Sequence, residues 1–187
     1  MSGTDGSQDW VAAGFKALAE GGVDLVRVEV LAQRMGVTKG GFYRRFRDRP
    51  ALLDAILAEW VAGRMEAIQR QTELGDATPT ERLRAVIQLF AARLNAEGLS
   101  IELAIRQWAR RDPRAAAAVS AVDAVRLERV TALYGALGFG AGEARARGLI
   151  FYAFIFGQGL LLPEATSAER DEMMTACADA LVDIAGG

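Results

Sequence analysis

The stretch that decides the fold is Val28–Phe46, VEVLAQRMGVTKGGFYRRF. It predicts two short helices joined by a tight turn at Gly36, because glycine readily adopts the left-handed conformation that such a corner requires. Apolar residues recur at helical spacing along one side, namely Leu31, Ala32, Met35, Val37, Phe42 and Phe46. Hydroxyl and basic residues fall between them and would face outward. A helix-turn-helix with a cationic outer face is typical of proteins that bind DNA.

Positive charge is concentrated around this stretch rather than spread over the chain. The 187 residues carry a net charge of −2, yet six basic residues and one acid lie between Gln33 and Pro50. Contacts with a phosphate backbone would therefore depend on local charge. The basic residues are Arg34, Lys39, Arg44, Arg45, Arg47 and Arg49.

The rest of the chain predicts further helices and no sheet. Helical periodicity indicates an all-α fold with about nine helices. Cap signals stand at Asp9, Asp48, Thr78–Glu81, Asp112–Pro113 and Thr166–Glu169. Gly98 would end one helix and Ser100 would begin the next. We expect a helix-turn-helix DNA-binding domain over residues 1–47 and a helical regulatory and dimerisation domain over 48–187, linked by a helix from about 48 to 71.

The composition argues against several functions. One cysteine, Cys177, and no histidine leave neither a cysteine metal cluster nor the commonest general base. The glycine run at 135–142 lacks the spacing of a nucleotide-binding loop. We therefore expect no cofactor, no metal and no enzymatic activity. The most apolar run, 149–162, is shorter than the ~20 residues of a membrane helix, and no leader is recognisable, so we expect a cytoplasmic protein that does not enter a membrane.

Residues 36–43, GVTKGGFY, followed by Phe46 and Asp48–Leu53, resemble the TetR family of bacterial transcriptional regulators. The resemblance covers roughly Trp10 to Trp60, and the remaining chain shares the family's helix count and layout. It implies a homodimer that binds the two halves of a near-palindromic operator in double-stranded DNA and pairs through its last two helices. It also implies a small-molecule effector that binds in the helical body and changes the separation of the DNA-reading helices.

This sequence departs from the family pattern at several positions. A small hydroxyl residue is usual where Gly41 stands, and an aromatic residue and a histidine are frequent where Arg44 and Arg45 stand. A Ser or Thr cap is common at the position of Arg27 and Val28. The mode of docking on DNA carries over, whereas the base preference does not.

The candidate DNA-binding residues surround the turn. Thr38 would cap the second helix of the motif or bind a phosphate oxygen. Lys39 would contact either a base edge, most naturally a guanine, or a phosphate. Gly40 and Gly41 would let the backbone approach the duplex with no Cβ in the way. The full set is Thr38, Lys39, Gly40, Gly41, Tyr43, Arg44, Arg45 and Arg49.

Residues for an effector and for a second subunit are expected in the helical body. An apolar ligand would contact Trp60, Met65, Phe90, Trp108, Tyr134, Phe151 and Tyr152, although core packing is the ordinary role of each. The dimer interface would use Gly148, Phe156, Leu160, Met173 and Ala180.

The leading hypothesis is therefore a homodimeric, sequence-specific DNA-binding regulator, most naturally a bacterial repressor released by a small, mostly apolar ligand. The alternative is a helical small-molecule-binding protein or enzyme whose basic N-terminus is incidental. A regulator that responds to a protein partner, or to no effector, is the third possibility.

Overall fold

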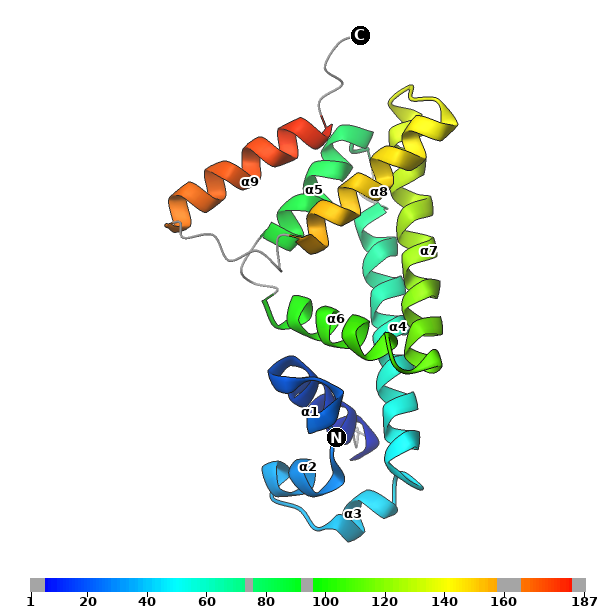
Figure 1. Cartoon of the computed structure of the whole chain (residues 1–187), viewed down its shortest axis with the longest axis vertical. Coiled ribbons are helices and arrows are strands. Elements are labelled where there is room, and N and C mark those ends of the chain that lie inside the picture. Colours follow the sequence, from blue (N-terminus) through cyan, green and yellow to red (C-terminus); the bar gives the residue numbers. More distant parts are fainter. Residues whose placement is uncertain (1–5, 73–75, 92–95, 158–165, 183–187) are drawn as a thin grey trace. The chain divides into compact units, whose positions relative to one another are not determined.

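The computed structural model describes residues 6–72, 76–91, 96–157 and 166–182. Within these ranges it contains nine α-helices, one short 3-10 helix and no strand (Figure 1). The predicted all-α class is confirmed. The elements are α1 (Gly6–Gly21), η1 (Val23–Leu25), α2 (Val28–Met35), α3 (Lys39–Tyr43), α4 (Arg49–Thr72), α5 (Pro79–Ala91), α6 (Ala96–Ala109), α7 (Pro113–Ala136), α8 (Ala141–Gly157) and α9 (Ser167–Val182).

The chain divides into two compact units. The first takes its described residues from Met1–Met65 and Ala96–Val122, and the second from Glu66–Asn95 and Asp123–Gly187. Helices α4 and α7 contribute residues to both. Within the first unit α1 packs against α6, so residues on both sides of the predicted boundary at residue 47 share one core. The division at residue 47 into a DNA-binding part and a regulatory part therefore stays a prediction.

The core of the first unit is built around α1, α2 and the start of α4. Trp10 and Leu18 of α1, Leu31 of α2 and Ile56 of α4 are all buried. Helices α1 and α4 meet closely at Gly14, where an added Cβ would lie 2.4 Å from Ile56 Cδ1. The apolar stripe of each helix therefore faces inward, as helical periodicity requires.

The core of the second unit joins α5, the end of α7, α8 and α9. Leu83 and Ile87 of α5 pack in one cluster with Tyr134 of α7 and Phe151 of α8. The Tyr134 hydroxyl donates a hydrogen bond of 2.8 Å to the carbonyl oxygen of Leu181 on α9. Burial raises the pKa of Tyr134 to about 12, so the hydroxyl keeps its proton and remains a donor.

Aspartate side chains cap the starts of α4 and α7, as predicted. Asp48 Oδ1 accepts a hydrogen bond of 2.9 Å from the backbone N–H of Ala51. Asp112 Oδ1 accepts one of 2.9 Å from the backbone N–H of Arg114. The bond from Ala51 lowers the pKa of Asp48, and the bonds from the Arg114 side chain lower that of Asp112 further. Both helix starts are therefore stabilised by an ionised carboxylate.

Reciprocal capping boxes begin α5 and α9, again as predicted. Glu81 Oε2 accepts a bond of 2.7 Å from the backbone N–H of Thr78, and Thr78 Oγ1 accepts one of 3.3 Å from that of Glu81. Thr166 and Glu169 repeat this arrangement at 2.8 Å and 3.3 Å. Each box satisfies two backbone donors at a helix start.

Two predicted helix boundaries are wrong. Helix α1 begins at Gly6, so Asp9 lies within the first turn, where an acid is still favourable, rather than at the cap. Helix α6 begins at Ala96, so Gly98 and Ser100 lie inside it. Burial of Ile105 and Trp108 on α6 shows that tertiary packing outweighs the low helix propensity of that glycine.

The predicted ends of the last two helices, at Leu162 and near Ile184, lie outside the described residues. Over the part of the chain that is described, no helix is both long and apolar enough to cross a membrane.

Candidate functional site

Helices α2 and α3 form the predicted helix-turn-helix. Gly36 ends α2 in the left-handed conformation, with a φ of 66°, and its N–H bonds the carbonyls of Ala32 and Gln33. The N–H of Val37 also donates to the Ala32 carbonyl, at 3.0 Å. These bonds satisfy carbonyls at the end of α2 and turn the chain sharply into α3. The corner expected at Gly36 is confirmed.

An aromatic cluster fixes α3 against the rest of the unit. Phe42 is fully buried, and its ring meets Trp10 of α1 edge-on at a centroid distance of 5.2 Å. Phe46 stacks on the Phe42 ring at a centroid distance of 5.6 Å. Such contacts favour one orientation of the short helix. Since Phe42 points inward, the residues on the opposite side of α3 are directed to solvent.

The outward side of α3 carries the predicted DNA-binding residues. All of the following are exposed: Thr38, Lys39, Gly40, Tyr43, Arg44 and Arg45; Gly41 is half-buried. Tyr43 is 60% exposed, and its ring keeps an edge-on contact with Phe42. The structure therefore brings these residues together on one surface, which we call the α3 face.

Neither packing nor backbone conformation requires the two glycines of the α3 face. The positive-φ glycines among the described residues are Gly22, Gly36 and Gly138. A Cβ at Gly41 would meet no atom within 4 Å, and one at Gly40 would lie 3.6 Å from Thr38 Oγ1. In a helix each glycine is less favourable than alanine by about 1 kcal/mol. The fold of the free protein leaves both unexplained.

Helices α2 and α3 begin without side-chain caps. Arg27 and Thr38 occupy the cap positions in extended conformations, and neither side chain makes a capping hydrogen bond. The predicted capping role of the Thr38 hydroxyl is therefore wrong in this structure. Its predicted contact with phosphate is the alternative that stays a prediction.

Acidic residues accompany several of the basic side chains around the motif. Lys39 Nζ lies 2.9 Å from Glu29 Oε1, and Arg34 Nη1 lies 2.6 Å from Glu20 Oε2. The hydrogen bond from Lys39 is the main reason that the pKa of Glu29 is lowered. The sequence reasoning missed Glu29, although an acid in the first turn of α2 was a usable signal.

Arg49 has a structural role in place of the predicted contact with DNA. Its Nε donates to the carbonyl of Val26 at 2.6 Å, and its Nη2 donates to that of Val23 at 2.7 Å. The guanidinium therefore ties the start of α4 to η1 and the residue after it. Because the group is partly buried and both bonds are internal, we withdraw Arg49 from the DNA-binding set.

Arg44 and Arg45 remain on the α3 face. The Arg44 side chain is exposed and makes no hydrogen bond or ion pair among the described residues. Arg45 is also exposed and lies beside the start of α1, where a Cβ at Gly6 would be 3.4 Å from Arg45 Nε. Both side chains can therefore reach a partner outside the protein.

The predicted ligand residues belong to different units. Trp60, Met65 and Trp108 lie in the first unit, Tyr134, Phe151 and Tyr152 lie in the second, and the side chain of Phe90 lies outside the described residues. Trp108 Nε1 donates to Asp112 Oδ2 at 3.1 Å, which serves the start of α7. The buried Trp60 Nε1 has no hydrogen-bond partner among the described residues. Trp60, Trp108, Tyr134, Phe151 and Tyr152 are buried and Met65 is half-buried, so their contact with a ligand stays a prediction.

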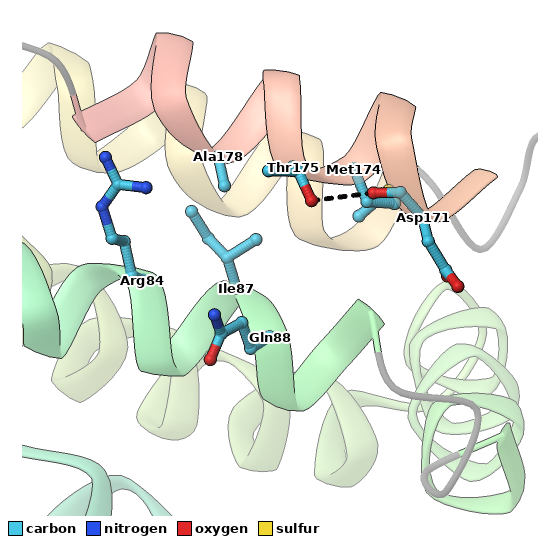
Figure 2. A pocket seen from close by; sticks show the side chains of 7 residues that line it. All are labelled: Arg84, Ile87, Gln88, Asp171, Met174, Thr175 and Ala178. Carbon is cyan, nitrogen blue, oxygen red and sulfur yellow. Dashed lines mark hydrogen bonds between the residues drawn. The ribbon is translucent and has the colours of Figure 1, made fainter. Parts of the chain in front are cut away.

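A groove of about 210 Å³ lies between α5 and α9 of the second unit (Figure 2). Its lining residues are Arg84, Ile87, Gln88, Asp171, Met174, Thr175 and Ala178, none of which was predicted to bind a ligand. Arg84 forms an ion pair with Asp179, and the Thr175 hydroxyl donates to the carbonyl of Asp171 at 2.8 Å. The volume is below the ~300–1,000 Å³ usual for ligand pockets, so the groove alone identifies no effector.

Helices α8 and α9 expose apolar side chains. Leu149 and Ile150 of α8 are 61% and 57% exposed, and Met173 of α9 is 45% exposed. Ala180, also on α9, is exposed, and its place in a dimer interface stays a prediction. A contiguous apolar patch on a protein surface is typical of a site that meets a partner, and these residues are candidates for one.

Two other predicted interface residues pack within the protein. A Cβ at the buried Gly148 would lie 3.1 Å from Thr131 Oγ1, so this glycine permits a close approach of α7 and α8 rather than of two subunits. Phe156 is half-buried and stacks on Tyr152 at 6.0 Å. Leu160 lies outside the described residues.

The helix-turn-helix of α2 and α3, with its exposed cationic α3 face, is typical of DNA-binding proteins. Residues 11–56 match the model of the bacterial regulatory proteins, tetR family, and this span contains α2 and α3 completely. The chain therefore carries an N-terminal TetR-family domain, and the resemblance seen in the sequence is confirmed. A search of curated proteins gives no match.

Solved structures share the whole fold. A transcriptional regulator from Rhodococcus sp. Rha1 aligns with a TM-score of 0.76 at 20% identity, covering 94% of this chain and 93% of its own. A tetR-family bacterial regulatory protein from Rhodococcus RHA1 aligns at 0.71 and 17%, covering 98% of both chains. A candidate transcriptional regulator from Saccharomonospora viridis, in complex with choline, aligns at 0.78 and 16%, covering 92% and 93%. At these identities the likeness establishes the fold.

Proposed function

We propose that the protein is a homodimeric, sequence-specific transcriptional repressor that acts in the bacterial cytoplasm and joins the nucleoid when bound to its operator. One observation carries this proposal: the α3 face presents lysine, arginine, tyrosine and two sterically unneeded glycines on a helix-turn-helix within the TetR-family match. Exposed positive charge on such a motif suits a DNA backbone. No comparable purpose within the free protein accounts for the glycines.

On DNA, α3 would lie in the major groove with its outward side against the bases. Arg44, Arg45 and Tyr43 would bind phosphate oxygens and fix the register, while Lys39 would reach a base edge. The missing Cβ atoms at Gly40 and Gly41 would let the helix backbone come close to the duplex. Two copies of the motif would occupy successive major grooves ~34–36 Å apart.

A homodimer would form through α8 and α9. The exposed Leu149, Ile150 and Met173 support this proposal, because an isologous interface would cover apolar surface on both subunits. The TetR-family domain at the N-terminus supports it as well, since a near-palindromic operator requires two copies of the motif.

Release from the operator would follow binding of a small, mostly apolar molecule in the helical body. The S. viridis relative holds choline, which supports the capacity of this fold for a small ligand. The predicted aromatic residues and the groove between α5 and α9 are the candidate regions. A ligand that favours a conformation with the wrong spacing of α3 would lower operator affinity through a coupling of typically ~1–3 kcal/mol.

The proposal is tested by selecting bound fragments from a bacterial genomic DNA library that includes the region upstream of the protein's own gene. Gel shifts at several salt concentrations then quantify binding. We expect selective binding that weakens steeply with salt, because phosphate contacts release counterions. The variant Arg44→Ala/Arg45→Ala should bind all sequences more weakly, whereas Arg129→Ala, an exposed arginine of α7, should not. A lack of selective binding at every salt concentration would refute the proposal.

A further inference from the structure

The ion pair between Lys39 and Glu29 joins the two helices of the DNA-binding motif. Lys39 Nζ on α3 and Glu29 Oε1 on α2 are 2.9 Å apart, and both side chains are more than half exposed. Lys39 is the one basic residue within α3 itself, whose sequence is KGGFY. The cation best placed to read a base is therefore held by a carboxylate in the free protein.

The chemistry of this pair affects differently the two groups of DNA that Lys39 could bind, a base edge and a phosphate. An ammonium group has three donors, and the carboxylate of Glu29 occupies one of them. The remaining two match the N7 and O6 acceptors of guanine, which are neutral and tolerate a nearby carboxylate. A phosphate oxygen in the same place would put a second anion beside Glu29, and like charges at short range repel.

We propose that Glu29 is a specificity-determining residue, which orients the Lys39 ammonium toward a guanine edge and disfavours its binding to phosphate. This inference rests on the proposed function. It selects between the two roles that the sequence left open for Lys39. Glu29 itself acts on DNA mainly through the lysine, as a positioning residue.

The neighbouring residues are arranged to make this contact possible. Gly40 and Gly41 follow Lys39 directly and carry no side chain that would hold the helix away from the groove. The Thr38 hydroxyl makes no capping bond. A base contact by Lys39 is therefore not obstructed by side chains of the two residues that follow it.

The experiment compares the full-length protein on its selected operator and on a scrambled duplex of equal length, over a range of salt concentrations. We expect Glu29→Gln to tighten binding to the scrambled duplex by about tenfold and to the operator by less, because Lys39 then binds phosphate freely. The ratio of operator to scrambled affinity should therefore fall severalfold, by at most about tenfold. In a Lys39→Ala background, Glu29→Gln should leave that ratio unchanged.

Glu20→Gln provides the matched control. Glu20 is as exposed as Glu29, at 55%, and it also pairs with a basic residue of the motif, Arg34. The substitution removes the same charge from the same unit as Glu29→Gln does. Glu20 itself makes no contact with Lys39 among the described residues. We expect the substitution to leave the affinity ratio of the protein unchanged, because a shift in overall charge affects both duplexes alike.

The inference is overturned if Glu29→Gln and Glu20→Gln leave the ratio equally unchanged, or if Glu29→Gln lowers the ratio as much without Lys39 as with it. A wild-type protein that prefers no sequence would instead overturn the proposed function, and this inference with it. The two failures are distinguished by the wild-type measurement alone.

Discussion

The helix-turn-helix and four of the helices outside it begin in different ways. Helices α4, α5, α7 and α9 each begin with a side chain that accepts a hydrogen bond from a backbone N–H. Helices α2 and α3 begin at Arg27 and Thr38 with no such bond. Helix α3 also contains two glycines that its own packing does not require. Side-chain caps and helix-favouring residues are therefore missing where the protein is proposed to meet DNA.

This difference indicates what the α3 face is built for. Side-chain caps and alanine in place of glycine would each favour the helices of the free protein, typically by about 1 kcal/mol. Their absence has a physical reason if backbone N–H groups and a bare helix surface must face phosphates and bases. Sites that bind a partner commonly depart from the rules that stabilise the rest of a fold.

The largest effect on stability is expected at Arg49, which supports the helix-turn-helix without belonging to the α3 face. Arg49→Ala removes hydrogen bonds to the carbonyls of Val26 and Val23 and should lower the free energy of unfolding by about 2 kcal/mol. Urea unfolding followed by circular dichroism measures it. The control is Arg47→Ala, whose side chain is 83% exposed and pairs with Asp48. A change within about 0.5 kcal/mol is expected there. Equal effects would show that the internal bonds do not stabilise the protein.

Removing a side-chain cap from one helix and adding a side-chain cap to another tests directly the difference between the capped helices and the helix-turn-helix. Thr78→Ala should lower the free energy of unfolding by about 1 kcal/mol, because it removes one half of a capping box. Arg27→Ser places an acceptor at the start of α2, where none is used, and should raise that energy by a similar amount, about 1 kcal/mol. Thermal unfolding of both variants measures the changes. A destabilised Arg27→Ser variant would mean that the start of α2 is already satisfied in another way.

The acid sensitivity of the capped starts gives a smaller effect. Hydrogen bonds from Arg114 lower the pKa of Asp112 in the folded protein well below its usual value. Its stabilising effect is therefore complete above the unfolded pKa of ~3.9 and is lost as the pH falls below it. Asp112→Asn keeps a cap but cannot titrate. Between pH 5 and pH 3 the free energy of unfolding of this variant should therefore fall less than that of the wild type. The free energy of unfolding is measured by urea titration at each pH. If it fell equally with pH in the wild type and in Asp112→Asn, Asp112 would not be the source of the acid sensitivity.

Much of the fold could be predicted because its signals are local. A cap residue and the helix that follows it are neighbours in sequence, so Asp48, Asp112 and the two Thr–Glu boxes were found correctly. The corner at Gly36 was equally local. The boundary at Gly98 was misplaced because burial of Ile105 and Trp108, which depends on distant contacts, decides where α6 forms.

The candidate site was only partly accessible from the sequence. The exposed α3 face follows from helical periodicity, since Phe42 fixes which side is buried. The role of Arg49 depends on carbonyls 23 and 26 residues away, and that of Gly148 depends on Thr131 of another helix. Neither contact leaves a pattern in the sequence. Basic character alone therefore could not distinguish Arg49, which bonds within the protein, from the exposed arginines of the α3 face.

The central claim is that the glycines of the α3 face serve DNA rather than the fold. The direct test is to measure unfolding energy and operator affinity in parallel for Gly40→Ala/Gly41→Ala. We predict that unfolding energy rises by about 1–2 kcal/mol for the pair, since added Cβ atoms meet no clash. Operator affinity should fall by about tenfold or more, because those atoms would face the groove in the proposed complex. Unchanged affinity, or a loss of stability, would contradict the claim.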